Sequence, residues 1–204
     1  MNGGCMMYGT LAYDDATHTY SVGGVLVPGV TQLLTAYGLK SAGPYPIGYA
    51  ERGKAVHEWC ERYARGERVV DGLQIAEYEY INAFANWMEE RKVHVLETEV
   101  PVVHSVDGMM YAGRLDLLAD LNVYGVEKPR VLVDIKSGVW QAWHKVQLAA
   151  YALAVKPGSV VALYLRPDGT WEEEWISTQA LLAAVNMFVD ALRNYYDEKR
   201  EEVE

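Results

Sequence analysis

Asp134 and Lys136 interrupt the apolar run VLVDIKSG, which spans residues 131–138. Because side chains two positions apart on a strand face the same side, both charged groups are expected to project together, with Val133 and Ile135 pointing into the opposite layer. Charges inside an apolar strand are costly to bury unless they are paired. The run by itself therefore fits two hypotheses: an ion pair at a strand end, or an acid and a lysine that take part in chemistry.

A second acid, Asp116, lies among leucines in the preceding run, GRLDLL. If the two runs form neighbouring strands, Asp116 and Asp134 converge on one point. Converging carboxylates repel each other unless they share a proton or a cation, and hard divalent cations such as Mg²⁺ or Mn²⁺ favour carboxylate oxygens. A metal held there would activate a water and stabilise charge on a scissile phosphate, with Lys136 beside it.

The order of these residues resembles the PD-(D/E)XK nuclease superfamily, most closely its RecB-like and Cas4-like branch with phage-type exonucleases. The resemblance rests on Glu99, the GRLD run ending at Asp116, the triplet 134–136 and the run QLAAY at 147–151. The stretch HTYSVGGVLVPGVTQLL also looks like the start of such phage proteins, although Gly29 replaces the serine of their usual Pro-Ser-Val-Thr run. The likeness covers about residues 13–176.

The resemblance implies a metal shell for Mg²⁺ or Mn²⁺. Position by position, it makes Asp116 and Asp134 the metal-binding acids, adds the backbone carbonyl of Ile135 as a ligand, and makes Lys136 the catalytic lysine. The run GKAVH resembles the helix motif whose histidine completes the shell, which assigns His57 as a ligand. Taken without the resemblance, a lone helical histidine is more often structural.

Other residues are assigned to the site less directly. The resemblance selects Glu99 to bind a second metal or hold a water, although two acids on a solvated edge, with Glu97, are the alternative. Gln147 and Tyr151 lie four apart on one helical face, and the resemblance implies that they line the active site. Candidate phosphate contacts are Arg52, Lys54, Arg114 and Lys145, and Trp140 and Trp143 could stack on unpaired bases or serve packing.

The elements that must position these residues follow from periodicity and turn residues. Residues 11–34 indicate two hairpin-like pieces feeding a helix from about Thr31. Helices are predicted at about 47–65, 73–92, 141–155 and from 178 onward, and strands at 93–103, 109–121, 130–137, 159–166 and 171–176. In the first of these helices Ala50, Gly53, His57, Cys60 and Ala64 share one stripe, which is expected to face inward.

This order predicts an α/β fold with a central mixed β-sheet flanked by α-helices, a restriction-endonuclease-like PD-(D/E)XK core. We expect residues 1–204 to form a single nuclease domain. Its expected parts are N-terminal hairpins and helices at 1–92, the catalytic sheet core at 93–176 and a C-terminal helix at 177–204.

The composition bears on partners and location. The formal charge of −10 argues against tight non-specific DNA binding, but residues 170–204 alone hold nine acids and three bases, which is six of those ten charges. The two cysteines, Cys5 and Cys60, have no paired spacing, so no iron–sulfur cluster is expected. Without a signal peptide or an apolar run of roughly 18 residues, a cytoplasmic protein with no membrane partner is expected, in the host cell if viral.

These inferences predict a metal-dependent DNA nuclease, in particular an exonuclease of phage-type DNA recombination, replication or repair. Its expected partners are DNA and a recombination or replication protein. Three alternatives stay open at this point: a DNA endonuclease of the same fold, a non-catalytic nuclease-fold module for DNA binding or assembly, and another metal-dependent hydrolase that uses the same two acids.

Overall fold

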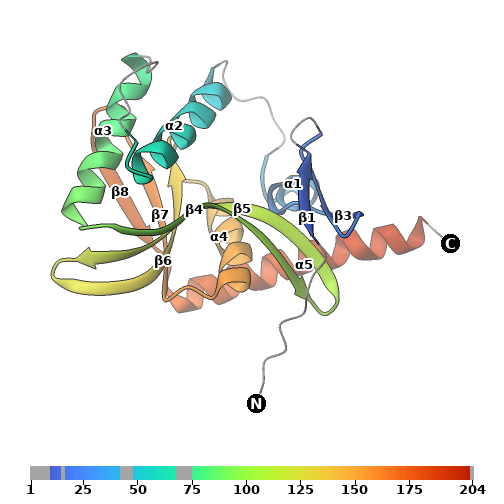
Figure 1. Cartoon of the computed structure of the whole chain (residues 1–204). Helices are drawn as coiled ribbons and strands as arrows, with labels where there is room; N and C mark the ends of the chain where they lie inside the picture. Colours follow the sequence, from blue (N-terminus) through green and yellow to red (C-terminus); the bar gives the residue numbers. More distant parts are fainter. Residues whose placement is uncertain (1–9, 15–16, 42–47, 68–74, 203–204) are drawn as a thin grey trace.

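A five-stranded sheet forms the centre of the computed structural model, which describes residues 10–14, 17–41, 48–67 and 75–202 (Figure 1). Its strands, in spatial order, are β4 (His94–Val106), β5 (Met109–Val123), β6 (Val126–Lys136), β7 (Ser159–Leu165) and β8 (Trp171–Trp175). β6 and β7 run parallel, whereas the other neighbouring pairs are antiparallel. The predicted mixed sheet is therefore confirmed.

Helices cover both faces of this sheet (Figure 1). On one face lie α2 (Tyr49–Ala64) and α3 (Ile75–Glu90), and on the other lie α1 (Val30–Ala36), α4 (Ala142–Val155) and α5 (Thr178–Glu201). Because side chains alternate along β6, this strand contributes to the apolar core on each face of the sheet. Val131 and Val133 pack in the core beneath α2 and α3, and Leu132 packs in the core beneath α4 and α5. The α/β architecture with helices on both faces is the one that the sequence predicts.

A small antiparallel sheet precedes these elements and is joined to the large one. It consists of β1 (Leu11–Asp14), β2 (Thr19–Val22) and β3 (Val25–Val27), in that order. The backbone N–H of Ala112 in β5 donates to the carbonyl of Pro28 at 3.0 Å. Gly29 follows, and a Cβ there would lie 3.2 Å from the Tyr20 ring, so a side chain at this position would crowd the tyrosine. The small sheet thus brings Tyr20 against the start of α1.

The inward stripe predicted for the first long helix is wrong in part. The buried residues of α2 are Val56, Trp59 and Cys60, whereas Ala50 is exposed. Burial of large apolar side chains is worth more than burial of small ones, so the helix turns its bulky side towards α3 and the sheet. The predicted helix starts at about residues 47 and 73, like Cys5, lie outside the described residues.

A buried ion pair fastens α3 to the edge strand β8. The Arg91 side chain, which follows α3, donates to Glu173 through Nε at 2.9 Å, and both side chains are less than one tenth exposed. The indole N–H groups of Trp87 and Trp175 donate to the same carboxylate at 2.7 and 3.1 Å. Arg91 also donates to Glu90 at 2.6 Å, but the two indoles and the guanidinium Nε all donate to Glu173, which therefore anchors this end of the α2–α3 layer.

We predict that Glu173→Gln lowers the free energy of unfolding by about 2 to 3 kcal/mol, because it leaves Arg91 buried without its main counter-charge. Urea denaturation followed by circular dichroism measures the change. Glu172→Gln is the matched control, since Glu172 is exposed and pairs with Arg166, and it should change stability by under about 0.5 kcal/mol. Equal effects of the two substitutions would contradict the anchoring role.

The same network predicts a pH dependence. Burial raises the pKa of Glu173, but the hydrogen bonds from Arg91, Trp87 and Trp175 together lower it further, so it lies below its ordinary value of 4.5. A lowered folded-state pKa contributes stability above the unfolded-state value, and this stability is lost as the pH falls through the folded-state value. The wild-type protein should therefore lose more stability than Glu173→Gln in urea titrations taken from pH 6 down through the acid range. Parallel loss in both proteins would contradict this origin.

Candidate metal centre

The candidate centre lies where β5 and β6 stop pairing. Their register ends with Leu117 opposite Val133, and one further step along it sets Asp116 opposite Asp134. At that step the carboxylate of Asp116 accepts the backbone N–H of Ile135 at 2.6 Å, so a side chain takes the place of the partner strand. The strands part here while β6 continues beside β7, which leaves room for side chains between them.

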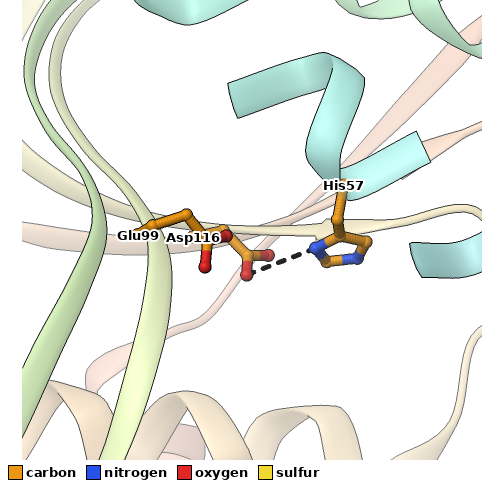
Figure 2. A group of neighbouring side chains, drawn as sticks. All are labelled: His57, Glu99 and Asp116. Carbon is orange, nitrogen blue, oxygen red and sulfur yellow. Dashed lines mark ion pairs between the residues drawn. The ribbon is translucent and has the colours of Figure 1, made fainter. Parts of the chain in front are cut away.

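Three potential ligands from three elements meet at this fork (Figure 2). One ligand atom each from His57 of α2, Glu99 of β4 and Asp116 of β5 all lie within 4.8 Å of one another. His57 Nδ1 is 3.4 Å from the Asp116 carboxylate. An imidazole and two carboxylates in this arrangement form a donor set that suits a divalent cation.

Glu99 reaches the group through an irregular backbone. The β4–β5 register pairs Thr98 with Leu117 and Val100 with Leu115, which sets Glu99 opposite Asp116. Its φ of 48° lies in the left-handed region that residues other than glycine seldom adopt. Such a conformation persists only where the surrounding structure holds it. Glu97 is exposed, so the structure brings Glu99, and not its neighbour on the strand, to the other ligands.

Asp134 and Lys136 lie on the opposite side of β6 from Val133 and Ile135, as the alternation predicts. Lys136 Nζ is 2.6 Å from Asp134 Oδ2 and donates to Gln147 Oε1 at 2.9 Å. The Oδ2 atom is fully buried and, among the described residues, accepts no well-directed hydrogen bond. A buried carboxylate oxygen with spare acceptor capacity fits a site that also accommodates a cation.

The pKa values of the two aspartates at the fork are shifted in opposite directions. Burial and repulsion from Asp116 raise the pKa of Asp134 to about 6, against the opposing effect of Lys136. Burial also acts to raise the pKa of Asp116, but His57, Lys136 and the Ile135 N–H outweigh it and hold that pKa below its ordinary value. Perturbed carboxylates of this kind, close to one another and buried, are characteristic of functional sites.

Several of the predicted site residues line one open cavity of about 430 Å³, but Asp134 and Lys136 are not among them, and Asp134 is outside the group formed by His57, Glu99 and Asp116. Its lining includes His57, Glu99, Asp116, Gln147 and Tyr151, the basic residues Lys54 and Arg114, and the acids Glu58 and Glu61. Arg114 also pairs with Glu99 at 3.3 Å. Among the predicted phosphate contacts, Arg52 lines two other cavities, one of which it shares with His57. Lys145 pairs with Glu174 at 2.8 Å.

Several residues at the site carry no sequence signal of their own. Tyr13 and Tyr20 of the small sheet line the same cavity, and Arg114 packs over the Tyr13 ring at 5.1 Å from its centroid. Gly113 has a steric role, because a Cβ there would lie 2.7 Å from the Tyr151 ring. The glycine of the GRLD run is a signal for such a close approach, whereas the tyrosines reach the site only through the tertiary fold.

Comparison with known proteins supports the architecture. No family model matches the chain, and no curated protein matches it. Among solved structures, a candidate exonuclease from Eubacterium rectale has a similar fold, with a TM-score of 0.54 and 10% identity over 85% of this chain and 74% of that one. An alkaline exonuclease from Laribacter hongkongensis is similar at a TM-score of 0.40 and 13% identity, over 87% and 95% of the two chains. The first likeness confirms the predicted fold.

Neither likeness distinguishes the RecB-like and Cas4-like branch from other members of the fold, so that assignment stays a prediction.

A membrane span requires a helix of sufficient length and hydropathy. Within the described ranges, no helix is both long enough and apolar enough to cross a bilayer.

We predict that Glu99→Gln weakens binding of Mn²⁺ about tenfold, because it removes one anionic ligand from the group of three. Isothermal titration calorimetry with MnCl₂ measures the affinity. Glu97→Gln removes the same charge from an exposed position on the same strand and should leave the affinity unchanged. Equal loss in both variants would mean that only the overall negative charge attracts the ion, and would exclude Glu99 as a ligand.

Proposed function

We propose that this protein is a Mg²⁺- or Mn²⁺-dependent DNA nuclease that hydrolyses phosphodiester bonds, and more finely an exonuclease of phage-type DNA recombination, replication or repair. The observation that carries the proposal is the strand fork. There the register sets Asp116 opposite Asp134 on neighbouring strands, and Lys136 pairs with Asp134. A metal shell next to a lysine, open to a cavity, is suited to hydrolysis of an anionic ester.

In this proposal the protein's own residues hold the ion and orient the reacting groups. His57, Glu99, Asp116 and Asp134 supply the side-chain ligands, together with the backbone carbonyl of Ile135. A bound Mg²⁺ or Mn²⁺ would supply a water of lowered pKa and a positive charge next to the scissile phosphate.

The Lys136 ammonium lies between Asp134 and Gln147, which restrict its position. One of its remaining protons is thus available to the attacking water or to a phosphate oxygen. Gln147 and Tyr151 are positioning residues, since Gln147 accepts from the lysine and Tyr151 packs against Gly113 at the cavity wall.

The shared fold with a candidate exonuclease supports the nuclease proposal, as does the charge around the site. Although the chain carries ten excess negative charges and Glu58 and Glu61 also line the cavity, Lys54 and Arg114 lie there next to the proposed ligands. Basic groups that flank a metal centre would engage a phosphate backbone locally, without a basic surface over the whole protein.

One observation favours a second candidate, the non-catalytic nuclease-fold module. The ion pairs between Lys136 and Asp134 and between His57 and Asp116 already balance part of the charge at the fork. A protein that had lost activity could keep such a network for stability. Cleavage assays separate the two candidates, and they also separate an exonuclease from an endonuclease of the same fold.

We predict that the wild-type protein degrades linear DNA in Mg²⁺ or Mn²⁺, leaves circular DNA intact and is inactive in EDTA. Asp134→Asn and Lys136→Gln should each lower the rate at least about a thousandfold, because they remove a metal ligand and the charge beside it. Gel assays on linear and circular DNA, single- and double-stranded, measure the rates, and circular dichroism checks folding. Glu97→Gln is the control and should keep full activity.

Each result has a distinct meaning. Cutting of circles would identify an endonuclease, and no cleavage of any of the four DNA forms would favour the non-catalytic module. Variants at Asp134 and Lys136 that cleave like the parent would show that the reaction takes place elsewhere.

A further inference from the structure

A second cavity, of about 540 Å³, is lined in part by Lys136 and by none of His57, Glu99 and Asp116. We name it the Arg52 pocket. It is enclosed by the first turn of α2, the loop after β6, the start of α4 and the end of β7, and its lining includes Tyr49, Arg52, Tyr80, Lys136, Trp143 and Arg166. A volume in this range is typical of pockets that hold one small ligand.

The unpaired charge of Arg52 indicates that this pocket binds an anion. Its guanidinium carbon lies 4.3 Å from the centroid of the Tyr49 ring and 5.5 Å from that of Tyr80. The Nε atom is buried without a hydrogen-bond partner among the described residues, and no carboxylate of those residues forms an ion pair with the side chain. A guanidinium that aromatic rings hold in place, with its charge unpaired, is preorganised for bidentate binding of an anion such as phosphate.

A second unpaired cation lies next to it. Lys40, which follows α1, is half-buried, and its Nζ is 4.8 Å from the centroid of the Trp143 ring. The Nζ of Lys136 is 5.5 Å from the same centroid. Lys40, Arg52 and Lys136 line one adjoining cavity, and within the described chain only Lys136 has a carboxylate partner. Like charges gathered in this way repel one another until an anion joins them.

The remaining wall has a different character. Besides the rings of Tyr49 and Tyr80, it is formed by Val139, Leu165 and Pro167. Aromatic and aliphatic surface beside a cationic group matches the two halves of a nucleotide, since a base stacks on such a surface without regard to its sequence while its phosphate needs the cation.

We propose that the Arg52 pocket binds the nucleotide next to the scissile bond, on an unpaired DNA strand, with its phosphate on Arg52 and Lys40 and its base against the apolar wall. This inference rests on the proposed nuclease function and adds to it the path that the DNA strand takes across the protein. His57 lines both the ligand cavity and the cavity shared by Lys40 and Arg52. The strand therefore crosses the metal centre from the side of Lys54 and Arg114 to the side of Arg52.

The test measures binding without cleavage. A fluorescein-labelled thymidine oligonucleotide is titrated with the protein in EDTA, and fluorescence anisotropy gives the affinity at several salt concentrations. Arg52→Gln and Lys40→Gln should each weaken binding about tenfold, as expected for loss of a charge-assisted hydrogen bond. Each should also reduce the slope of log K against log salt by about 0.7, the value for one phosphate contact on a single strand.

Arg62→Gln is the matched control. Arg62 also lies in α2 and packs over an aromatic ring, 4.4 Å from the Trp59 centroid, but its Nε donates to Glu67 and it lines none of these cavities. It should leave both affinity and slope unchanged. Arg52→Lys keeps the charge but loses bidentate geometry, so it should give an intermediate affinity and guards against a folding defect in the glutamine variant.

Competition tests the nucleotide assignment. Thymidine 5′-monophosphate should displace the oligonucleotide better than thymidine or inorganic phosphate, and Arg52→Gln should abolish its advantage. Inorganic phosphate competing equally well would overturn the assignment of a base site. Wild-type affinity in Arg52→Gln and Lys40→Gln would overturn the pocket even if the protein cleaves DNA, whereas weakened binding in a protein that never cleaves would support the pocket and refute the nuclease.

Discussion

The hydrogen bond from the Ile135 N–H to the Asp116 carboxylate is the contact on which the rest of the site depends. A sheet normally satisfies such an amide with the carbonyl of a neighbouring strand, which would fill the gap with backbone. Here the carboxylate satisfies it, so β5 and β6 can part without leaving a buried donor unpaired. The same bond fixes Asp116 where Glu99 and His57 can approach it. The Asp116 carboxylate therefore both completes the hydrogen bonding of the sheet and takes part in the candidate site.

The alternation of β6 extends this constraint into both helical layers. Val133 and Ile135 are buried beneath α2 and α3, so Asp134 and Lys136 must face the side of α4, where Gln147 accepts from the lysine. The α2 helix packs through Val56 and Trp59 and carries His57 to within 3.4 Å of the Asp116 carboxylate. A slip of one residue along β6 would exchange its buried and functional faces together, which ties the geometry of the site to the register of the core.

Strong local patterns made much of this predictable. The apolar run around Asp134 fixed both a strand and the direction of its charged side chains, and the order of strands and helices indicated the mixed sheet. Contacts that depend on the tertiary fold were not predictable. No local signal places Tyr20 or Lys40 near the site, and the stripe through Ala50 failed because the bulkier Val56 and Trp59 determine which side of α2 is buried. The positive φ of Glu99 likewise has no signal in the local sequence.

At residue 99 the most stable backbone and the presence of a carboxylate require different amino acids. Glycine would relieve the left-handed φ of residue 99, which costs about 1 kcal/mol for a glutamate, yet glycine offers no carboxylate. A change that makes the fold more stable would thus remove one of the three proposed ligands, whereas the glutamate keeps β4 less stable than glycine would. Screens of variants for heat resistance alone would therefore favour proteins that lack this proposed ligand.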